Sequence, residues 1–468
     1  MVGEAVDMVT TTATLSIQKS KAPAIPYATK EYSESALNQH NNILRIYFNQ
    51  LDNIIGRLVS TISTGVPITF PDSAIDAFGR LVTSQPYTLF DSQNRYGIDD
   101  QFDTSTATSG STSFLSNESS VQLSVTTASG SEVVRQSFRN MAYQPGKGLT
   151  FLATFVMNAA KTNLRQRVGY FNTSNGAFLQ QDGTTVSFVL RSNSIPTPGT
   201  PSDIRTVNQA DWNVDKMDGN GPSGRVLDLS KNQILYMDFE WLGTGDVRCG
   251  FYVDGQPQIC HIFHNDNTQI AVYMQTAILP VRYEITNTGV TATSSSMKQV
   301  CSTVINMGGY EQLTVDHSAR RTSVLTTIGT TFKPLVSIRL ASTALGAVVI
   351  PNRVLVLPTT SQNYEVALTR NATLTGASWV AVPSDSNVEY DVSATAVTGG
   401  TIVQSDYTTA SGSGGARILE ASTEYNWDLQ LGCSLTNVSD ILTIEIRTVS
   451  GATTGDAFGT LTFFDLTK

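Results

Sequence analysis

The β character of this chain is clearest in Val247-Arg-Cys-Gly-Phe-Tyr-Val-Asp-Gly-Gln-Pro-Gln-Ile-Cys260. Two strand-like runs flank Asp254-Gly255, a dipeptide typical of the two-residue turn of a β-hairpin. In the resulting register Tyr252 faces Pro257 and Cys249 faces Cys260, at a hydrogen-bonded pair whose geometry permits a disulfide. Residues 1–21 have no apolar run typical of a signal peptide, so we expect both thiols to be reduced.

Runs of the same kind continue on both sides of this hairpin. Val121–Val125 and Leu149–Val156 are examples, and Gly, Asn, Asp and Pro clusters separate such runs along the chain. Short strands with regular turn signals predict an antiparallel sandwich or jelly roll. We therefore predict a mostly β protein with two antiparallel β-sandwich domains of jelly-roll type, at residues 65–290 and 331–468, joined by a connector at 291–330.

The N-terminal segments differ in character from the rest. Residues 1–28 end in Ala22-Pro-Ala-Ile-Pro26, which excludes a helix there and predicts an extended docking arm. Residues 29–64 predict a single helix of coiled-coil type, because leucines recur in it every seven residues. Its predicted oligomerisation face consists of Leu37, Leu44, Tyr47, Phe48, Leu51, Ile54, Ile55 and Leu58. The alternative is an amphipathic helix that packs on the protein's own sheet.

Composition argues against several classes of partner. The formal net charge is −9, and no basic stripe is present to neutralise phosphates. No apolar run reaches the roughly 18 to 20 residues that span a bilayer. We therefore expect no nucleic-acid binding, no membrane insertion, and assembly in a cytoplasm.

Few residue patterns suit catalysis. The four histidines include His261 and His264, which we place on opposite faces of one strand, so they would not share a metal. Asp238 and Glu240 lie two residues apart on a strand, and the resulting separation of roughly 6.6 to 6.8 Å suits glycoside hydrolysis. The alternation around them, however, places both on the solvent face. We predict no enzyme and no cofactor, and keep a polysaccharide depolymerase as an alternative.

Two groups of residues are candidate binding sites. A glycine-rich loop concentrates oxygen ligands of the kind that calcium prefers, although such residues also suit an ordered turn without an ion. These residues are Asp211, Asn213, Asp215, Asp218 and Asn220. Trp212 and Trp241 are candidate glycan contacts, although most tryptophans of a sandwich belong to the core.

Several motifs share a resemblance that covers most of the chain from Tyr32 onward. They are Tyr32-Ser-Glu-Ser-Ala-Leu-Asn-Gln-His-Asn-Asn-Ile-Leu-Arg-Ile-Tyr-Phe-Asn-Gln-Leu-Asp52, Arg165-Gln-Arg-Val-Gly-Tyr-Phe171, Trp212-Asn-Val-Asp-Lys-Met-Asp-Gly-Asn-Gly221, Trp241-Leu-Gly243 and Val304–Glu311. This set resembles structural proteins of tailed bacteriophages, notably cyanophages. Met307 stands where the family pattern has an acidic residue before Gly308-Gly309, so no role of that acid is carried over.

The resemblance implies a virion protein: a tail fibre, neck or head-decoration subunit, and a homotrimer. Residues 1–28 would then bind other virion proteins, and the β domains would project outward. We expect a structural subunit of a virion appendage, assembled in the host cytoplasm. The alternative is a carbohydrate-binding, receptor-binding protein of host attachment that recognises surface glycans.

Overall fold

The computed structural model describes Asn38, residues 41–48, and residues 85–467 apart from 312–313, 383–384, 410–416, 421–426 and 450–453. The chain divides into two compact units, Met1–Thr83 and Ser84–Lys468. In the part of the chain that is described, no helix is long and apolar enough to cross a membrane.

In the first unit Asn38 and residues 41–48 are helical. Leu44 and Tyr47 are half-buried there, whereas Phe48 is exposed. The docking arm at 1–28 and the rest of the predicted oligomerisation face lie outside the described residues. The coiled-coil helix therefore stays a prediction.

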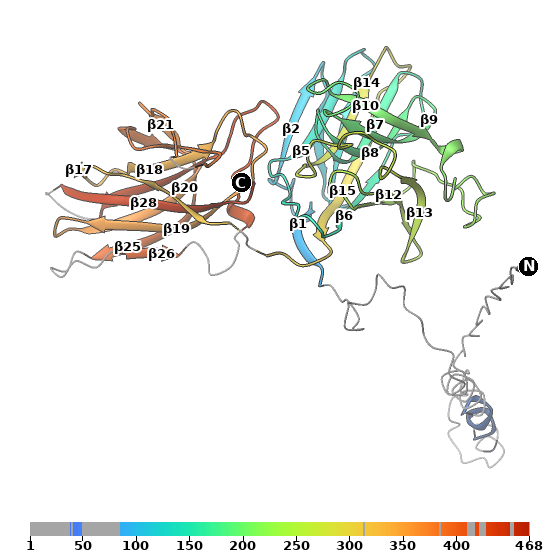
Figure 1. The fold of residues 1–468 in the computed structure, drawn as a ribbon, viewed down its shortest axis with the longest axis horizontal. Helices are drawn as coiled ribbons and strands as arrows, with labels where there is room; N and C mark the ends of the chain where they lie inside the picture. The colour runs from blue at the N-terminus through green and yellow to red at the C-terminus, as the bar shows by residue number, and fades with distance from the viewer. Residues whose placement is uncertain are drawn as a thin grey trace, which may run out of the picture. The chain divides into compact units, whose positions relative to one another are not determined.

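The second unit begins with a sandwich of two antiparallel sheets (Figure 1). Its eight-stranded sheet has the order β13 (Gln256–Phe263), β12 (Val247–Val253), β11 (Gln233–Phe239), β6 (Leu149–Val156), β15 (Ser295–Asn306), β4 (Ser120–Val125) and β3 (Ser111–Leu115), and β1 (Tyr87–Gln93) also pairs with β15. Its seven-stranded sheet has the order β10 (Ser202–Asn208), β9 (Thr185–Ser192), β8 (Gly176–Asp182), β7 (Leu164–Phe171), β14 (Val281–Asn287), β5 (Glu132–Ser137) and β2 (Phe102–Ala107).

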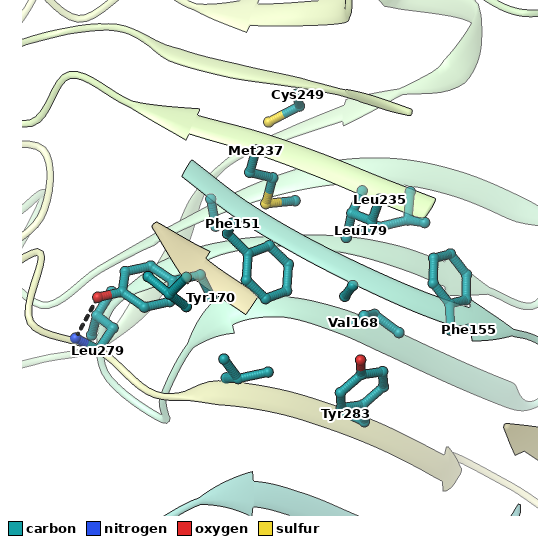
Figure 2. Packing of buried hydrophobic residues seen from close by; sticks show 14 of the residues in the cluster. Phe151, Phe155, Val168, Tyr170, Leu179, Leu235, Met237, Cys249, Leu279 and Tyr283 are labelled. Atoms are coloured by element: carbon teal, nitrogen blue, oxygen red, sulfur yellow. Dashed lines mark hydrogen bonds between the residues drawn. The ribbon is translucent and has the colours of Figure 1, made fainter. Parts of the chain in front are cut away.

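Alternate residues of these strands fill the core between the two sheets. Phe151 and Phe155 of β6 are fully buried, and the residues between them are not all buried, as expected for a strand with one face inward. Figure 2 shows both rings packed with Val168 and Tyr170 of β7. The hydroxyl group of Tyr170 accepts a hydrogen bond from the backbone N–H of Leu279 at 3.1 Å, so this buried polar group is satisfied.

The hairpin of β12 and β13 forms as predicted near its turn and differs farther out. Tyr252 pairs with Pro257, but a bulge lies between Gly250 and Cys249, which pairs with His261 rather than with Cys260. A Cβ atom on Gly250 would lie 2.0 Å from the Gln258 carbonyl oxygen, so the two backbones approach closely there. The predicted pairing of Cys249 with Cys260 is therefore wrong, and both are buried free thiols.

The second sandwich follows directly. One sheet has the order β16 (Asp316–Arg320), β28 (Gly455–Asp465), β19 (Val349–Pro358) and β26 (Arg417–Glu420), and β17 (Leu325–Ile328) also pairs with β28. The other has the order β22 (Val380–Ala381), β23 (Val388–Asp391), β18 (Lys333–Leu340), β27 (Ile441–Thr448), β20 (Asn363–Arg370) and β25 (Thr401–Thr409). A small sheet pairs β21 (Thr373–Thr375) with β24 (Ala396–Thr398), and short 3-10 helices are η2 (Gln209–Asp211) and η3 (Trp427–Leu429).

The prediction of a mostly β protein with antiparallel sheets is confirmed. The connector predicted at 291–330 differs, because β15 lies inside the eight-stranded sheet, between β6 and β4, while β16 and β17 belong to the second sandwich. The first sandwich therefore extends to Asn306, and strands of the second begin at Asp316. Alternation was the available signal: every second residue is buried from Ser295 to Gln299 and again from Ser302 to Asn306, and the phase shifts by one residue at the irregularity between them.

The two sandwiches contact each other through polar and aromatic groups. The amide group of Gln430 donates to the Asn140 carbonyl at 2.8 Å, and the Trp427 indole N–H donates to the Tyr87 hydroxyl at 2.8 Å. The Trp427 ring also meets the Tyr310 ring edge to face, with 5.0 Å between centroids. These contacts fix the junction beside which the candidate site lies.

Candidate functional site

A pocket of about 430 Å³ opens beside this junction. Its walls come from three distant segments: the residue after β5, the chain from the end of β20 to β22, and the loop that leads into β27. The lining residues are Phe138, Asn371, Ala372, Thr373, Leu374, Ala377, Trp379, Ser434, Val438, Ser439, Asp440 and Ile441. Pockets for small ligands commonly measure roughly 300 to 1,000 Å³ and combine apolar walls with a few polar groups, so this one is of suitable size and lining.

Trp379 is the largest apolar side chain of the pocket, and a fixed ion pair supports it. The Arg339 guanidinium lies over the indole ring, 4.3 Å from its centroid. Two nitrogens of Arg339 donate to Glu389 Oε2 at 2.9 and 2.8 Å. Arg339 is on β18 and Glu389 on β23, which pair directly, so the sheet sets the position of the guanidinium. One ring face therefore has a cationic partner while the half-buried indole also lines the pocket.

The polar rim of the pocket is shaped by Asp440. Its Oδ1 accepts from the Asn371 amide at 2.7 Å, and its Oδ2 accepts from Arg370 at 2.5 Å and from the Gly432 backbone N–H at 2.9 Å. Both carboxylate oxygens are thus used within the protein, so Asp440 holds two loops together. Hydroxyl groups at this rim come from Thr373, Ser434 and Ser439.

Phe138 closes the pocket from the first sandwich. Its carbonyl accepts a hydrogen bond from the Cys433 backbone N–H at 2.9 Å. A Cβ atom on Gly432 would lie 2.8 Å from both the Phe138 carbonyl oxygen and its Cβ, so only glycine permits this approach. The pocket therefore depends on the contact between the two sandwiches.

Neither predicted glycan contact is an exposed stacking platform. Trp212 is 2% exposed and stacks on Phe188 in the core, with 4.6 Å between ring centroids. Trp241 is half-buried; it meets Tyr143 edge to face and donates its indole N–H to the Met274 carbonyl. Burial excludes Trp212 as a glycan contact. Trp241 packs against Tyr143 and is fixed by its hydrogen bond to Met274.

The predicted calcium loop is stabilised by hydrogen bonds of its own. Asp215 accepts from the backbone N–H groups of Met217 and Ser223, each at 2.8 Å. Asp218 accepts from the Asn220 N–H in the same way, and Asn213 pairs with the backbone of Ile262. Asp211 ends η2 and lies outside this network. Hydrogen bonds lower the pKa of Asp215 although burial opposes them. These hydrogen bonds are those of an ordered turn.

A different cluster places three possible metal ligands within reach of one another. Ligand atoms of Asp246, His264 and Asp266 all lie within 4.8 Å of each other. Asp246 already contacts the His264 ring at 2.9 Å, however, and Arg205 donates to the His264 carbonyl at 2.8 Å. The positive charge of Arg205 therefore lies beside this cluster and disfavours a bound cation there. His261 is buried and His264 exposed, in agreement with the predicted opposite faces.

The two acids considered for catalysis lie on the solvent side of β11, as predicted. Asp238 is half-buried and Glu240 exposed, while Phe239 between them is buried. Burial raises the pKa of Asp238, and Arg248, 3.9 Å away, opposes this. Glu240 follows the last residue of β11. One carboxyl group with a raised pKa does not make the acid pair that glycoside hydrolysis requires.

Sequence reasoning did not single out Trp379. It is one of only four tryptophans, and it falls in a turn-rich segment between short strands rather than in a core-like run. That placement could have indicated a binding role, because a tryptophan outside a buried strand must cover its apolar ring with something other than the core.

A scan of the chain against protein-family models gives no match, and neither does a search of curated proteins. Several solved structures resemble part of the chain. The Emp47p carbohydrate recognition domain is 12% identical, with 51% of this chain and 99% of that domain covered and a TM-score of 0.29. A Bacillus licheniformis β-glucanase is 13% identical, with 49% and 99% covered and a TM-score of 0.29. A carbohydrate esterase of Shiga toxin-encoding bacteriophage phi24B is 13% identical, with 47% and 99% covered and a TM-score of 0.28. These TM-scores are too low for the similarities to indicate a function.

Proposed function

We propose that this protein binds carbohydrate and that a sugar ring stacks on Trp379. The observation that carries this proposal is a half-buried tryptophan, held by the Arg339–Glu389 pair, in the wall of an open pocket with hydroxyl groups at its rim. A pyranose ring has an apolar C–H face and hydroxyl groups at its edge. It therefore suits an aromatic wall with polar groups around it.

The other apolar residues of the wall favour the same ligand. Val438 is 62% exposed, and Leu374 and Trp379 are half-buried. Apolar side chains that gather in an open hollow gain from a partner that covers them. Catalysis is not part of the proposal, because the carboxylate of Asp440 in the pocket lining already accepts hydrogen bonds from Arg370, Asn371 and Gly432.

We further propose that the binding serves host attachment by a virion appendage. The phage-like motifs support this setting, and the described helix exposes Ile46 and Phe48, which suit contact with another chain. In this proposal residues 1–28 anchor the chain to other virion proteins, the helix makes a homotrimer, and the β-sandwiches meet surface glycans.

A glycan array probed with the full chain tests the binding proposal. Wild type should bind defined glycans, and Trp379→Ala should weaken that binding by about tenfold or more, as expected for loss of an aromatic anchor. Trp379→Phe should keep part of the affinity. Tyr96→Ala is the matched control, since Tyr96 is an 88% exposed aromatic residue elsewhere. Absence of binding by wild type, or full binding by Trp379→Ala, would refute the proposal.

A further inference from the structure

A second hollow, of about 290 Å³, lies where the two sandwiches meet and is called the junction hollow below. It shares Phe138 and Ser434 with the pocket that contains Trp379, so the two spaces adjoin at these residues. A ligand that is longer than the Trp379 pocket can therefore extend into the junction hollow.

Hydrogen bonds between the two sandwiches hold the walls of the junction hollow. The Asn140 side-chain amide donates to the Gly346 carbonyl at 3.2 Å. The Leu435 backbone N–H donates to a carboxylate oxygen of Asp103 at 2.7 Å. Because these bonds join distant parts of the chain, the hollow is already formed before a ligand arrives, and less ordering entropy is lost on binding.

Amide side chains dominate the polar part of this lining. Among the described residues that line the junction hollow, the amides are Gln136, Asn140, Asn172 and Asn437. An amide group offers both a donor and an acceptor, and so does the hydroxyl group of a sugar. A wall of this kind suits an uncharged ligand with many hydroxyl groups.

Two of these amides are already oriented through their oxygen atoms. Gln136 Oε1 accepts from Arg282 at 2.9 Å. Asn172 Oδ1 accepts from the backbone N–H groups of Ser174 and Asn175, each at 2.8 Å. In both side chains the NH2 group has no hydrogen-bond partner within the described part of the chain. Two oriented donors therefore remain for the hydroxyl groups of a ligand.

The charges of both spaces are paired within the protein. Among the described residues, Arg282 is the one charged side chain of the junction hollow, and Glu284 Oε2 accepts from its Nε and Nη2 at 3.3 and 3.2 Å. In the Trp379 pocket, Asp440 is paired with Arg370 in the same way. A charged ligand would lose its hydration without gaining an unpaired partner, so this lining favours a neutral one.

We infer that the ligand of the Trp379 pocket is a neutral oligosaccharide whose chain continues into the junction hollow. One sugar ring stacks on Trp379, and hydroxyl groups of the following sugars accept hydrogen bonds from the Gln136 and Asn172 amides. The inference rests on the proposed function, because it names the class and the length of the glycan that the same site takes. A single sugar fills one space only, whereas a chain reaches both.

Binding of the full chain to glycans of increasing length tests the inference. The probes are malto-, cello- and manno-oligosaccharides from monosaccharide to hexasaccharide, measured by isothermal titration calorimetry. A glycan array extends the comparison to other neutral glycans and to charged ones, each at several lengths. We expect a hexasaccharide to bind about tenfold tighter than its monosaccharide, as one or two added hydrogen bonds provide. Charged substituents should add no affinity.

The thiol of Cys433 reports where the bound chain lies. Cys433 lines the junction hollow and is outside the lining of the Trp379 pocket. We therefore expect a bound hexasaccharide to slow the labelling of Cys433 by a thiol reagent, whereas a bound monosaccharide should not. Cys301, the exposed thiol on β15, is the internal control and should react at the same rate in every sample.

Two variants remove the proposed donors and keep the hydrogen bonds that orient them. Asn172→Asp and Gln136→Glu each retain the accepting oxygen and lose the NH2 group. Each should weaken hexasaccharide binding several-fold and leave monosaccharide binding unchanged. Gln122→Glu makes the same change at a half-buried amide of β4, in the other sheet, and is the matched control. Thermal unfolding of all three variants checks that they are folded.

The outcomes separate this inference from the proposed function. Equal affinity for monosaccharide and hexasaccharide, binding to charged glycans alone, or full labelling of Cys433 under bound hexasaccharide overturns the inference. So does a length preference that both amide variants retain. If binding in these cases still needs Trp379, the proposed function stands. No binding to any oligosaccharide or to the array overturns both.

Discussion

The guanidinium of Arg339 lies 4.3 Å from the centroid of the Trp379 ring, and Glu389 holds it there from the neighbouring strand. The relationship links the fold to the site, because the pairing of β18 with β23 positions a side chain that lines a pocket. Fixing the ring before a ligand arrives reduces the entropy lost on binding.

Removing Arg339 should weaken glycan binding more than it lowers the stability of the fold. For Arg339→Ala we expect a several-fold loss of glycan affinity, since the indole loses its partner. Unfolding free energy should fall by only about 1 kcal/mol or less, because the pair is partly exposed. Calorimetry and urea denaturation measure the two effects. Arg248→Ala, which removes a 54% exposed arginine of the first sandwich, is the control; equal affinities of both variants would contradict the supporting role.

Trp427 should couple the two sandwiches. Its ring is 9% exposed and lies near the rings of Tyr87 and Tyr310. We expect Trp427→Ala to lower stability by about 3 to 5 kcal/mol, as for other buried aromatic deletions. Urea denaturation should then show two transitions, since each sandwich has its own core. Trp427→Phe, which keeps a ring, should be milder; a single unshifted transition for Trp427→Ala would rule out the coupling.

The thiols should differ in reactivity according to burial. Cys301 is exposed and Cys433 half-buried, while Cys249 and Cys260 are buried. Burial, with Asp440 and Asp103, raises the pKa of Cys433 to about 11, so it should react more slowly than Cys301. Titration with a thiol reagent should therefore show Cys301 first in the native protein and all four thiols in denaturant. Recovery of only two thiols in denaturant would show a disulfide.

Stability should fall as the pH drops from about 6.5 toward 4. Burial, with the charges of Arg205 and His264, lowers the pKa of His261 from 6.5 to about 4. The unfolded chain therefore binds a proton more readily than the folded one in this window, and protonation favours unfolding. In the folded state Nδ1 of His261 accepts from the Asn213 N–H at 3.3 Å. Urea denaturation at pH 7 and pH 5 should show a smaller loss for His261→Gln than for wild type; equal losses would contradict this assignment.

The N-terminal helix should set the oligomeric state. We expect full-length protein to be a trimer by native mass measurement and a chain without residues 1–60 to be a monomer. Ile46→Asp with Phe48→Asp in the full chain should act like the truncation, because both side chains are exposed on the described helix. A monomeric full-length protein would show that the helix does not associate.

Local pattern was enough to predict much of the fold. The Asp254-Gly255 turn and the pairing of Tyr252 with Pro257 follow from two-residue hairpin geometry, which a few neighbouring residues specify. Alternation likewise placed Asp238 and Glu240 on the solvent side of β11. The contact of Cys249 with His261 was not predictable, because the bulge depends on how closely Gly250 approaches the partner strand.

The sequence by itself determined that this is a protein of short antiparallel strands, since periodicity and turn residues act over a few residues. Only the tertiary structure decided which aromatic residues are available to a ligand. Trp212 stacks on Phe188 inside the first sandwich, whereas Trp379 lines a pocket that needs Phe138 and Asp440 from far along the chain. Burial depends on which sheets pack together, and that is a property of the whole chain.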